Sequence, residues 1–522
     1  MPPMPSRRHL RTAWVALFLV LMPLGASAGD WFKFNFNLRF SNRFNLKQNF
    51  LNTEGGFFSR GYQELPESPF NLRFNKDELG YSGFLGAGAD LYLGRVASIH
   101  LTMDTGEIKF RPMIIYNPKP DCASDSTDPR CGVTSNGMDI ADQAEQTWFV
   151  REIFTELGFG RDEWLKFRLG KMLASTGNGF IMDNYALGGM LTADLDLGFE
   201  VPVKITLDGL LPNGDFTKEG KRSPYVYLDV AYLLSFFEEI GLFVAWYHDG
   251  DDIIGDIVRS IFADALIGSN PLLSVLVDNA EVTSRGNLFW VGLRGNKIFD
   301  RASLSATAII EFGSFDFTSR WYRPDLGRWD ELSSSPACLG WMADASFYYD
   351  ITDLFTLGGF FLFLSGETDA SRNMSQSGAR YNSFLSVYPY ITRTNIFFYG
   401  GMNQTYSARA FSTSGVSGKG VIAPGLTAGY DITDDLNVRF NSAVLFSHGP
   451  HTESESHFYG WENDLNLQWN VSKYLRILFE ADYLWTGDFF DFAKPLEEEA
   501  RNQTLVNEPN AWKVLVGLDV YY

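Results

Sequence analysis

Cysteine is scarce in this sequence, whose 522 residues include only Cys122, Cys131 and Cys338. None of the three stands in a CxxC or CxxCH arrangement, so the sequence supports neither a cysteine zinc site nor covalently attached haem. Positive charge is in deficit, since 43 Lys and Arg face 63 Asp and Glu and leave a net charge of −20. Phosphate binding depends on Lys and Arg, so this balance speaks against a nucleic-acid partner.

Long apolar runs are missing beyond an N-terminal leader. Residues 1–28 have a basic start with Arg7, Arg8 and Arg11, continue with an apolar run at 13–24 and end on Ala26-Ser27-Ala28, which predicts a signal peptide cleaved before Gly29. A twin-arginine signal is the alternative interpretation of residues 6–11. After the leader, the nearest apolar stretch, 225–247, is broken by three acidic residues, so helical membrane spans are excluded.

Aromatic residues and glycines are abundant instead, with 16% Phe, Trp and Tyr and 49 glycines. This composition is typical of strands at a membrane interface. Residues 512–522 are apolar at every second position, and in 459–469 apolar residues alternate with charged and amide side chains. Period-two alternation places successive side chains on opposite faces of a strand. For an exported chain of this kind, a closed barrel is the structure that satisfies every backbone group in lipid.

The predicted fold is therefore all-β: a transmembrane antiparallel β-barrel of about 18 strands that fills residues 29–522. The strands run from 31–45 to 511–522 and include 97–112 and 187–200; sixteen strands is the alternative. Short periplasmic turns and long extracellular loops are expected. The similar segments 349–354 and 430–436 predict one hairpin turn used twice. Tyr522 falls on the lipid-facing parity and predicts recognition by the outer-membrane assembly machinery.

Several short motifs go beyond general barrel character. They are Thr147-Trp148-Phe149-Val150-Arg151-Glu152, Phe167-Arg168-Leu169-Gly170-Lys171, Gly177-Asn178-Gly179, Asp183-Asn184, Ser386-Val387-Tyr388-Pro389-Tyr390 and Phe397-Phe398-Tyr399-Gly400. On these motifs the chain resembles the alginate-export family of eighteen-stranded outer-membrane porins. The resemblance implies a passive channel in the cell outer membrane for a hydrophilic solute or a polysaccharide.

The alternation also predicts which charged side chains line the pore. The expected acidic residues are Asp90, Asp104, Asp194, Asp196, Asp208, Asp229, Glu311, Asp344, Glu462, Asp464, Glu480, Asp482 and Asp519, and the expected basic residues are Lys166, Arg168, Lys204, Arg294, Arg439, Arg476 and Lys513. This excess of acids departs from the Lys- and Arg-lined lumen that polyanionic alginate requires.

Five of these residues, Asp194, Asp196, Arg168, Glu480 and Asp482, are expected to set the ion preference of the channel. Ladders of salt bridges that stiffen the barrel wall are the structural alternative for the inward charges.

The expected loops add few chemical sites. Cys122 and Cys131 predict a disulfide within the external segment 113–144. The helical spacing of apolar residues in 251–284 predicts either a constriction folded into the mouth or a helix packed on the rim. His448, His451 and His457 are better explained by a flexible polar loop than by a metal site.

No enzyme and no cofactor are expected, because His100 stands alone in its strand and no nucleophile motif accompanies the other histidines. The predicted function is a porin for passive passage or export of hydrophilic solutes, polysaccharides included. A barrel sheath around an export or electron-transfer complex is one alternative. A surface adhesin that acts through loops 113–144 and 368–418 is the other.

Overall fold

The computed structural model describes residues 32–50, 76–94, 96–105, 108–110, 149–212, 223–235, 238–250, 281–323, 328–367, 380–387, 389, 391, 393–398, 401, 415, 418–450, 455–489 and 510–522. The predicted signal peptide, the predicted disulfide between Cys122 and Cys131, the segment 113–144 and all of the loop 251–284 before Glu281 lie outside these residues. Within them, no helix has the length and apolarity needed to span a bilayer, a finding that has no bearing on a β-barrel.

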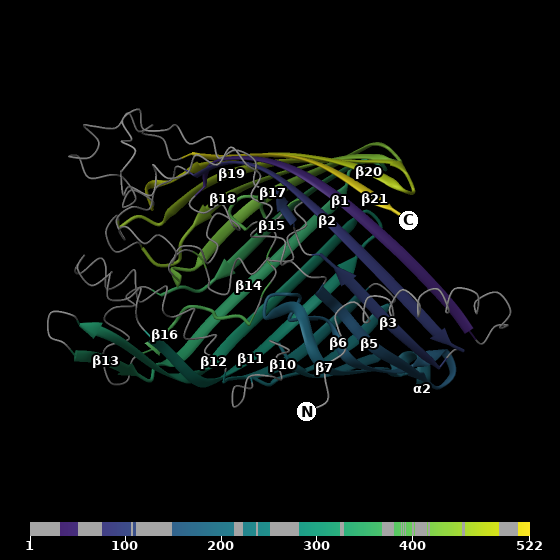
Figure 1. The fold of residues 1–522 in the computed structure, drawn as a ribbon, viewed down its shortest axis with the longest axis horizontal. Coiled ribbons are helices and arrows are strands. Elements are labelled where there is room, and N and C mark those ends of the chain that lie inside the picture. The colour runs from purple at the N-terminus through teal and green to yellow at the C-terminus, as the bar shows by residue number, and fades with distance from the viewer. Residues whose placement is uncertain are drawn as a thin grey trace, which may run out of the picture.

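Eighteen strands close into one antiparallel barrel (Figure 1). In chain order they are β1 (Phe32–Phe50), β2 (Lys76–Leu93), β3 (Ala97–Asp104), β5 (Phe149–Phe159), β6 (Leu165–Thr176), β7 (Met182–Asp194), β8 (Val203–Leu211), β9 (Tyr225–Ser235), β10 (Glu238–Asp249), β11 (Glu281–Ile298), β12 (Ala302–Arg323), β14 (Ala337–Asp350), β15 (Phe355–Leu364), β17 (Val421–Thr433), β18 (Leu436–Phe446), β19 (Phe458–Ser472), β20 (Leu475–Thr486) and β21 (Ala511–Tyr521).

Each barrel strand pairs with its neighbours in chain order, and the last strand pairs with the first, with Arg39 opposite Tyr521 and Gln48 opposite Trp512. Three further strands are accessory: β4 (Ile108–Phe110) continues the pairing of β2, β13 (Arg328–Ser334) pairs only with the end of β12, and β16 (Arg380–Tyr381) runs parallel to β14. The closed barrel of about 18 strands predicted from the alternation is confirmed.

Two predicted strand boundaries were wrong. The strand expected at 187–200 begins earlier, at Met182, and ends at Asp194, because the chain then forms the short helix α2 (Leu195–Phe199). The strand expected at 97–112 is interrupted between Asp104 and Ile108. Alternation continues through 194–200 in the sequence, so the pattern alone did not reveal the end of β7, whereas the run Asp104-Thr105-Gly106-Glu107 breaks the alternation at the second site.

Connections of a few residues gather at one end of the barrel, the right-hand end in Figure 1, which we call the short-turn end. The two similar turns predicted at this end have matching hydrogen bonds. Thr352 Oγ1 accepts from the backbone N–H of Phe355 at 3.0 Å, and Thr433 Oγ1 accepts from that of Leu436 at 3.1 Å. Most connections at the opposite, long-loop end are longer, but residues 177–181 join β6 to β7 there in a tight turn.

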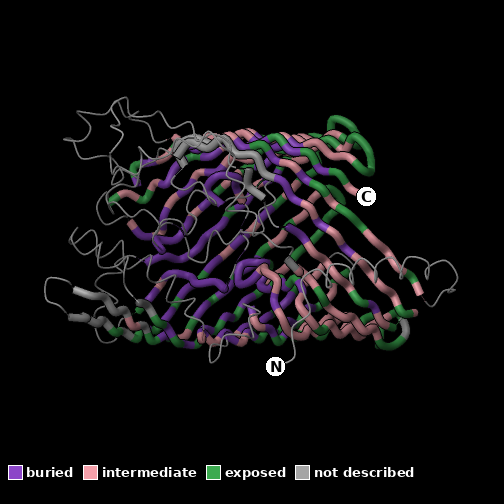
Figure 2. The backbone as a smooth tube through the Cα atoms, in the orientation of Figure 1, coloured by how far each residue is buried: buried purple, intermediate pink, exposed green. Residues whose placement is uncertain are grey.

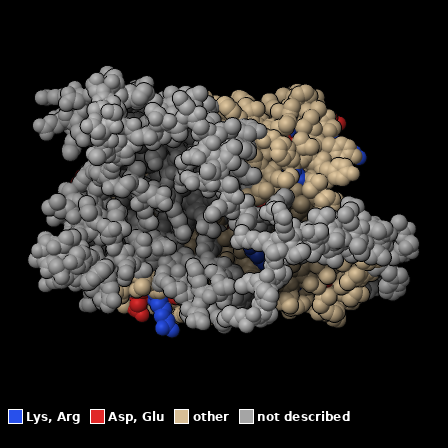
Figure 3. Space-filling model, in the orientation of Figure 1, with Lys and Arg blue, Asp and Glu red and all other residues tan. Residues whose placement is uncertain are grey.

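The outer face of the barrel is apolar and exposed, whereas polar groups are buried on the inner face. Along β9, Val226, Leu228 and Val230 are exposed, while Tyr227 and Asp229 between them are buried. The described part of the outer wall in Figure 3 shows few charged groups. This inversion of a soluble protein's pattern fits a barrel whose outer face contacts lipid.

The seam between β1 and β21 is held by a buried carboxylate. Asp519, fully buried, accepts from Arg43 Nη1 at 2.6 Å and from Arg476 Nη2 at 2.6 Å, and Arg39 Nη2 lies 3.8 Å away. Arg43 is itself buried. The three arginines come from β1 and β20, so Asp519 connects both strands that flank β21.

Asp519→Ala is expected to lower the free energy of unfolding by about 3–5 kcal/mol, because Arg43 would remain buried without its carboxylate. Urea unfolding of the barrel in detergent, followed by tryptophan fluorescence, measures the change. Asp353→Ala, which removes an exposed carboxylate from a turn, is the matched control. Equal stability of the two variants would contradict this role of Asp519.

Candidate functional site: the lumen and its inserted segment

Burial along the inner wall differs between the two ends of the barrel. Figure 2 shows buried residues gathered toward the long-loop end and intermediate or exposed residues toward the short-turn end. On β19, for example, inward Glu462 and Asp464 are buried, whereas Gln468 and Asn470 farther along the same face are partly exposed. The lumen is therefore filled near the long-loop end and accessible near the short-turn end.

The described residues of the stretch 380–398, which we call the inserted segment, cover the wall at the long-loop end. In its first half, the backbone N–H of Leu385 donates to the buried Glu311 of β12, and Trp290 Nε1 donates to the carbonyl of Leu385 at 3.1 Å. Ser365 Oγ donates to the carbonyl of Asn382 at 2.8 Å. The inserted segment has irregular backbone that is buried inside the barrel, and these hydrogen bonds satisfy its backbone N–H and C=O groups.

Acidic side chains of the wall hold the second half of the inserted segment. Arg393 Nε donates to Asp344 of β14 at 3.0 Å. Glu462 of β19 accepts from Thr394 Oγ1 at 2.8 Å, from the backbone N–H of Phe397 at 2.9 Å and from that of Ile396. One carboxylate thus receives three hydrogen bonds from a single turn of the segment.

Asn395 lies at the centre of a buried polar cluster. Its Nδ2 donates to Asp482 at 2.7 Å, and its backbone N–H donates to Asp464 at 3.2 Å. Lys513 Nζ donates to the carbonyl of Asn395 at 3.1 Å, lies 3.2 Å from Asp482 and forms an ion pair with Glu480. All of these wall side chains are at most a few per cent exposed, and Asn395 of the inserted segment bonds to Asp464, Asp482 and Lys513.

Apolar packing fixes the inserted segment as well. Phe384, Leu385, Ile396 and Phe397 are buried in the same hydrophobic cluster as Trp290 of the wall. The tight turn between β6 and β7 joins this cluster: Asn178 Nδ2 donates to Thr307 of β12 at 2.6 Å, and Val387 N–H donates to the carbonyl of Ile181 at 2.8 Å. Because β6 and β12 are separated by five strands around the wall, this turn reaches across the lumen.

The predicted pore-lining residues divide into three groups in the structure. Strand pairing places all of them except Asp196 on the inward side. Asp104, Asp208, Asp229, Glu311, Asp344, Glu462, Asp464, Glu480, Asp482, Lys513 and Asp519 are buried there, while Asp90, Lys166, Arg168, Arg294, Lys204, Arg439 and Arg476 keep part of their surface exposed.

The two acids near the predicted strand end differ from the rest. Asp194 ends β7, and its Oδ1 accepts from the backbone N–H of Leu197 in α2 at 3.3 Å. Asp196 lies within α2, exposed at the short-turn end and off the strand wall, so its predicted strand position was wrong.

Among the described residues that face the lumen, exposed charge is mainly basic, with Asp90 at 29% exposed as an acidic exception, although the sequence count favoured acids. Side chains of Lys166 and Arg168 are 41% and 43% exposed and those of Arg39 and Arg476 are 32% and 27% exposed, whereas Asp519 is fully buried. Arg168 pairs with Glu156, whose side chain is only 18% exposed. The inward acidic side chains are buried because the inserted segment covers some of them and arginine side chains pair with others.

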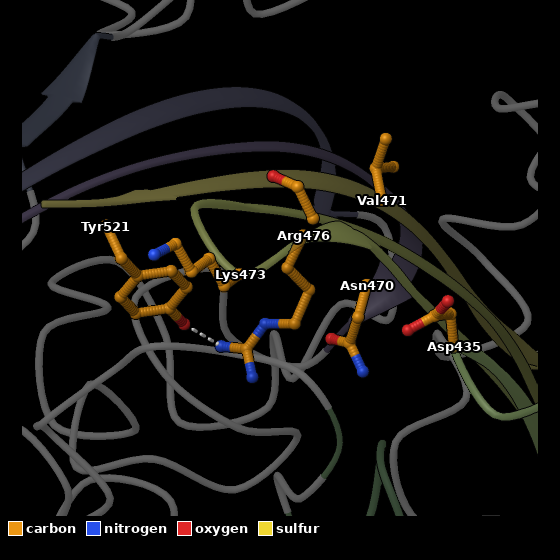
Figure 4. A pocket seen from close by; sticks show the side chains of 7 residues that line it. Asp435, Asn470, Val471, Lys473, Arg476 and Tyr521 are labelled. Atoms are coloured by element: carbon orange, nitrogen blue, oxygen red, sulfur yellow. Dashed lines mark hydrogen bonds between the residues drawn. The ribbon is translucent and has the colours of Figure 1, made fainter.

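A pocket opens at the short-turn end beside the seam (Figure 4). It is lined by Asp435, Asn470, Val471, Ser472, Lys473, Arg476 and Tyr521. The Arg476 guanidinium points to the Tyr521 hydroxyl and donates to it, and its carbon lies 5.3 Å from the centre of the Tyr521 ring. This pocket adds a basic group to the accessible part of the lumen.

The inserted segment was not predicted from the sequence, although the motif at Ser386–Tyr390 lies within it. The loop 251–284 was predicted instead, as either a constriction in the mouth or a helix packed on the rim. The histidines near the long-loop end have backbone partners: His448 Nδ1 lies 3.2 Å from the Gly366 backbone, and His457 Nδ1 lies 3.2 Å from the Ser447 carbonyl. Among the residues that the structure describes, no group of three or more His, Cys, Asp or Glu could hold a metal ion.

Comparisons with known proteins give structural likenesses only. No protein-family model matches the chain, and no curated protein sequence matches it. OccK9 (OpdG) of Pseudomonas aeruginosa is 14% identical, with 94% of this chain and 99% of that one covered and a TM-score of 0.45. OccAB1 of Acinetobacter baumannii is 9% identical, with 95% and 99% covered and a TM-score of 0.44.

A third solved structure, OpdK of Pseudomonas aeruginosa with vanillate, is 10% identical, with 94% of this chain and 99% of that one covered and a TM-score of 0.43. The barrel assignment made above rests on the strand pairing within this chain and not on these likenesses.

Proposed function

We propose that the chain is an outer-membrane channel for passive passage of small hydrophilic solutes. The observation that carries this proposal is the barrel itself: eighteen paired strands with an apolar outer face and a polar inner face that is accessible from the short-turn end. Water and solutes then share the part of the lumen that the inserted segment leaves uncovered. Larger barrels of this kind enclose aqueous channels.

Accessible bases in the lumen favour anionic solutes. Lys166, Arg168, Arg439 and Arg476 present charge where the wall is uncovered, while most inward acids are buried against the inserted segment or an arginine. Many exposed acids lie on the turns instead, namely Asp162, Asp196, Asp300, Asp353, Asp434 and Asp435, while Asp90 on the inner wall is 29% exposed. Solvent and salt screen those turn charges over about 8 Å, so the wall bases dominate in the narrower lumen.

The double substitution Arg168→Gln and Arg439→Gln is expected to lower the anion-to-cation permeability ratio severalfold. Both side chains face the accessible lumen, so their loss weakens the positive potential inside the channel. Reversal potentials across a salt gradient in planar bilayers measure this ratio. Arg301→Gln, which removes the same charge from an exposed turn, is the control and leaves the ratio unchanged. A ratio unaffected by the double substitution contradicts anion preference set by these bases.

A polyuronate such as alginate is the second candidate solute. It is supported by the motif Phe167–Lys171, which resembles the alginate-export porins and which places Arg168 on the inner wall beside Lys166. Carboxylates spaced along such a chain pair with wall cations. If a polyuronate is the solute, oligouronates block the current at lower concentrations than neutral oligosaccharides of equal length. Equal blocking concentrations contradict it.

A further inference from the structure

Three side chains on the inner wall form a hydrogen-bonded relay near the short-turn end. His100 of β3 has its Nε2 2.7 Å from Ser98 Oγ and its Nδ1 2.8 Å from Asp90 Oδ1. Ser98 lies two residues before His100 on the same face of β3, and Asp90 lies directly opposite His100 on β2. Residue patterns did not indicate this relay, because Asp90 and His100 come together only through the pairing register of β2 and β3.

The atoms are connected in the order that serine hydrolases use. Asp90 accepts from Nδ1–H and fixes the tautomer in which Nε2 carries a lone pair, and that lone pair accepts the Ser98 hydroxyl proton. A hydroxyl held in this way becomes a nucleophile when its proton moves to the imidazole. Geometry of this kind identifies such a site independently of fold and of residue order.

Aromatic side chains hold the imidazole in place. The His100 ring stacks on Phe154 of β5 at 4.7 Å between centroids, and Tyr92 of β2 meets it edge-on at 6.0 Å. Each of these flanking rings carries a cation: Arg168 lies 5.6 Å from the centre of Phe154, and Lys33 lies 5.8 Å from the centre of Tyr92. Lys33 therefore borders the relay as a positive group, where a developing oxyanion or a substrate carboxylate would need one, whereas Arg168 is already paired with Glu156.

We propose that Ser98, His100 and Asp90 form a catalytic triad that hydrolyses small carboxylic esters inside the lumen. Ser98 Oγ attacks the ester carbon and its proton passes to His100 Nε2. The C–O bond to the leaving alcohol then breaks, and that alcohol takes the proton. Water next attacks the acyl-serine with His100 as base, releasing the carboxylic acid and restoring the Ser98 hydroxyl.

The exposed fractions of the three side chains indicate which esters would react and how fast. The side chains of His100 and Asp90 are 21% and 29% exposed, and Ser98 is 7% exposed, so the site is reached from the lumen at the imidazole side. Small esters that carry an anionic group fit the neighbouring Lys33. Because Asp90 shares its charge with solvent, we expect slow turnover compared with triads whose acid is buried.

The test uses the full chain folded in detergent, treated with a fluorophosphonate probe and, separately, with p-nitrophenyl esters. Wild-type protein is expected to be labelled at Ser98, as located by peptide mass spectrometry, and to hydrolyse the esters. Ser98→Ala and His100→Gln abolish labelling, and Asp90→Asn lowers the hydrolysis rate on the order of 10³-fold.

Thr102→Ala, at the next inward position of β3, is the matched control and keeps wild-type labelling and hydrolysis. Heat-modifiable electrophoretic mobility shows that each variant is folded. Absence of labelling in folded wild-type protein, or hydrolysis that persists in Ser98→Ala, overturns the proposal. Channel conductance is recorded in parallel, and since Ser98→Ala leaves it unchanged, failure of the triad is distinguishable from failure of the channel function.

Discussion

Removal of residues 380–398, with a short Gly-Ser linker joining the cut ends, is expected to raise the single-channel conductance severalfold and to shift ion preference toward cations. The conductance rises because the inserted segment fills the lumen at the long-loop end. The preference shifts because the deletion uncovers carboxyl groups that the segment now buries, namely Glu311, Asp344, Glu462, Asp464, Glu480 and Asp482. Carboxylates exposed in a pore attract cations.

Planar-bilayer recordings of the deletion variant measure conductance and reversal potential together. Ser305→Ala is the control, since it removes an inner-wall hydroxyl whose recorded partner is Ser346 rather than the inserted segment. Conductance equal to wild type would show that residues 380–398 do not narrow the path. A larger conductance with unchanged anion preference would show that the inserted segment narrows the lumen. It would contradict the view that the deletion exposes carboxylates that attract cations.

Glu462→Ala is expected to release the inserted segment from β19 without removing it. The substitution leaves two backbone N–H groups and one hydroxyl of the segment without their acceptor, and an unsatisfied buried donor costs about 1–3 kcal/mol. The segment then undocks in a measurable fraction of molecules, which appears as stepwise openings to a higher conductance level. Faster hydrogen exchange at Ile396 and Phe397 accompanies these openings.

Glu462→Gln serves as the graded comparison, because its single amide oxygen keeps part of the acceptor capacity. We expect an effect between those of wild type and Glu462→Ala. Steady current and unchanged exchange in Glu462→Ala would contradict the view that this carboxylate holds the segment. The result is independent of the deletion experiment, since every residue of the segment is retained.

Strand positions were predictable because period two is a local property of the chain. Apolar residues at every second position of 512–522 identify the last strand without any knowledge of its partners. The same parity predicts Arg168 and Glu480 on the inner face; in the structure Arg168 pairs with Glu156, and Glu480 is fully buried beside Lys513. It failed at Asp196, because the five-residue helix α2 interrupts the strand while the alternation of residue types continues.

The contents of the lumen were not predictable from the same pattern. Contacts such as Thr394 with Glu462 and Asn395 with Asp482 join residues 68 and 87 positions apart. Nothing local in the sequence specifies them. Counting inward charges therefore gave an acidic lumen, because parity tells which way a side chain points but not whether another part of the chain covers it. The pairing of His100 with Asp90 was missed for a similar reason, since it depends on register.

Planar-bilayer recording of the purified wild-type chain alone tests whether the barrel is by itself a passive channel. We expect a steady open conductance without any added protein and a reversal potential displaced toward that of the anion. Silence of the folded barrel until a periplasmic partner is supplied would contradict it and favour a sheath around another protein.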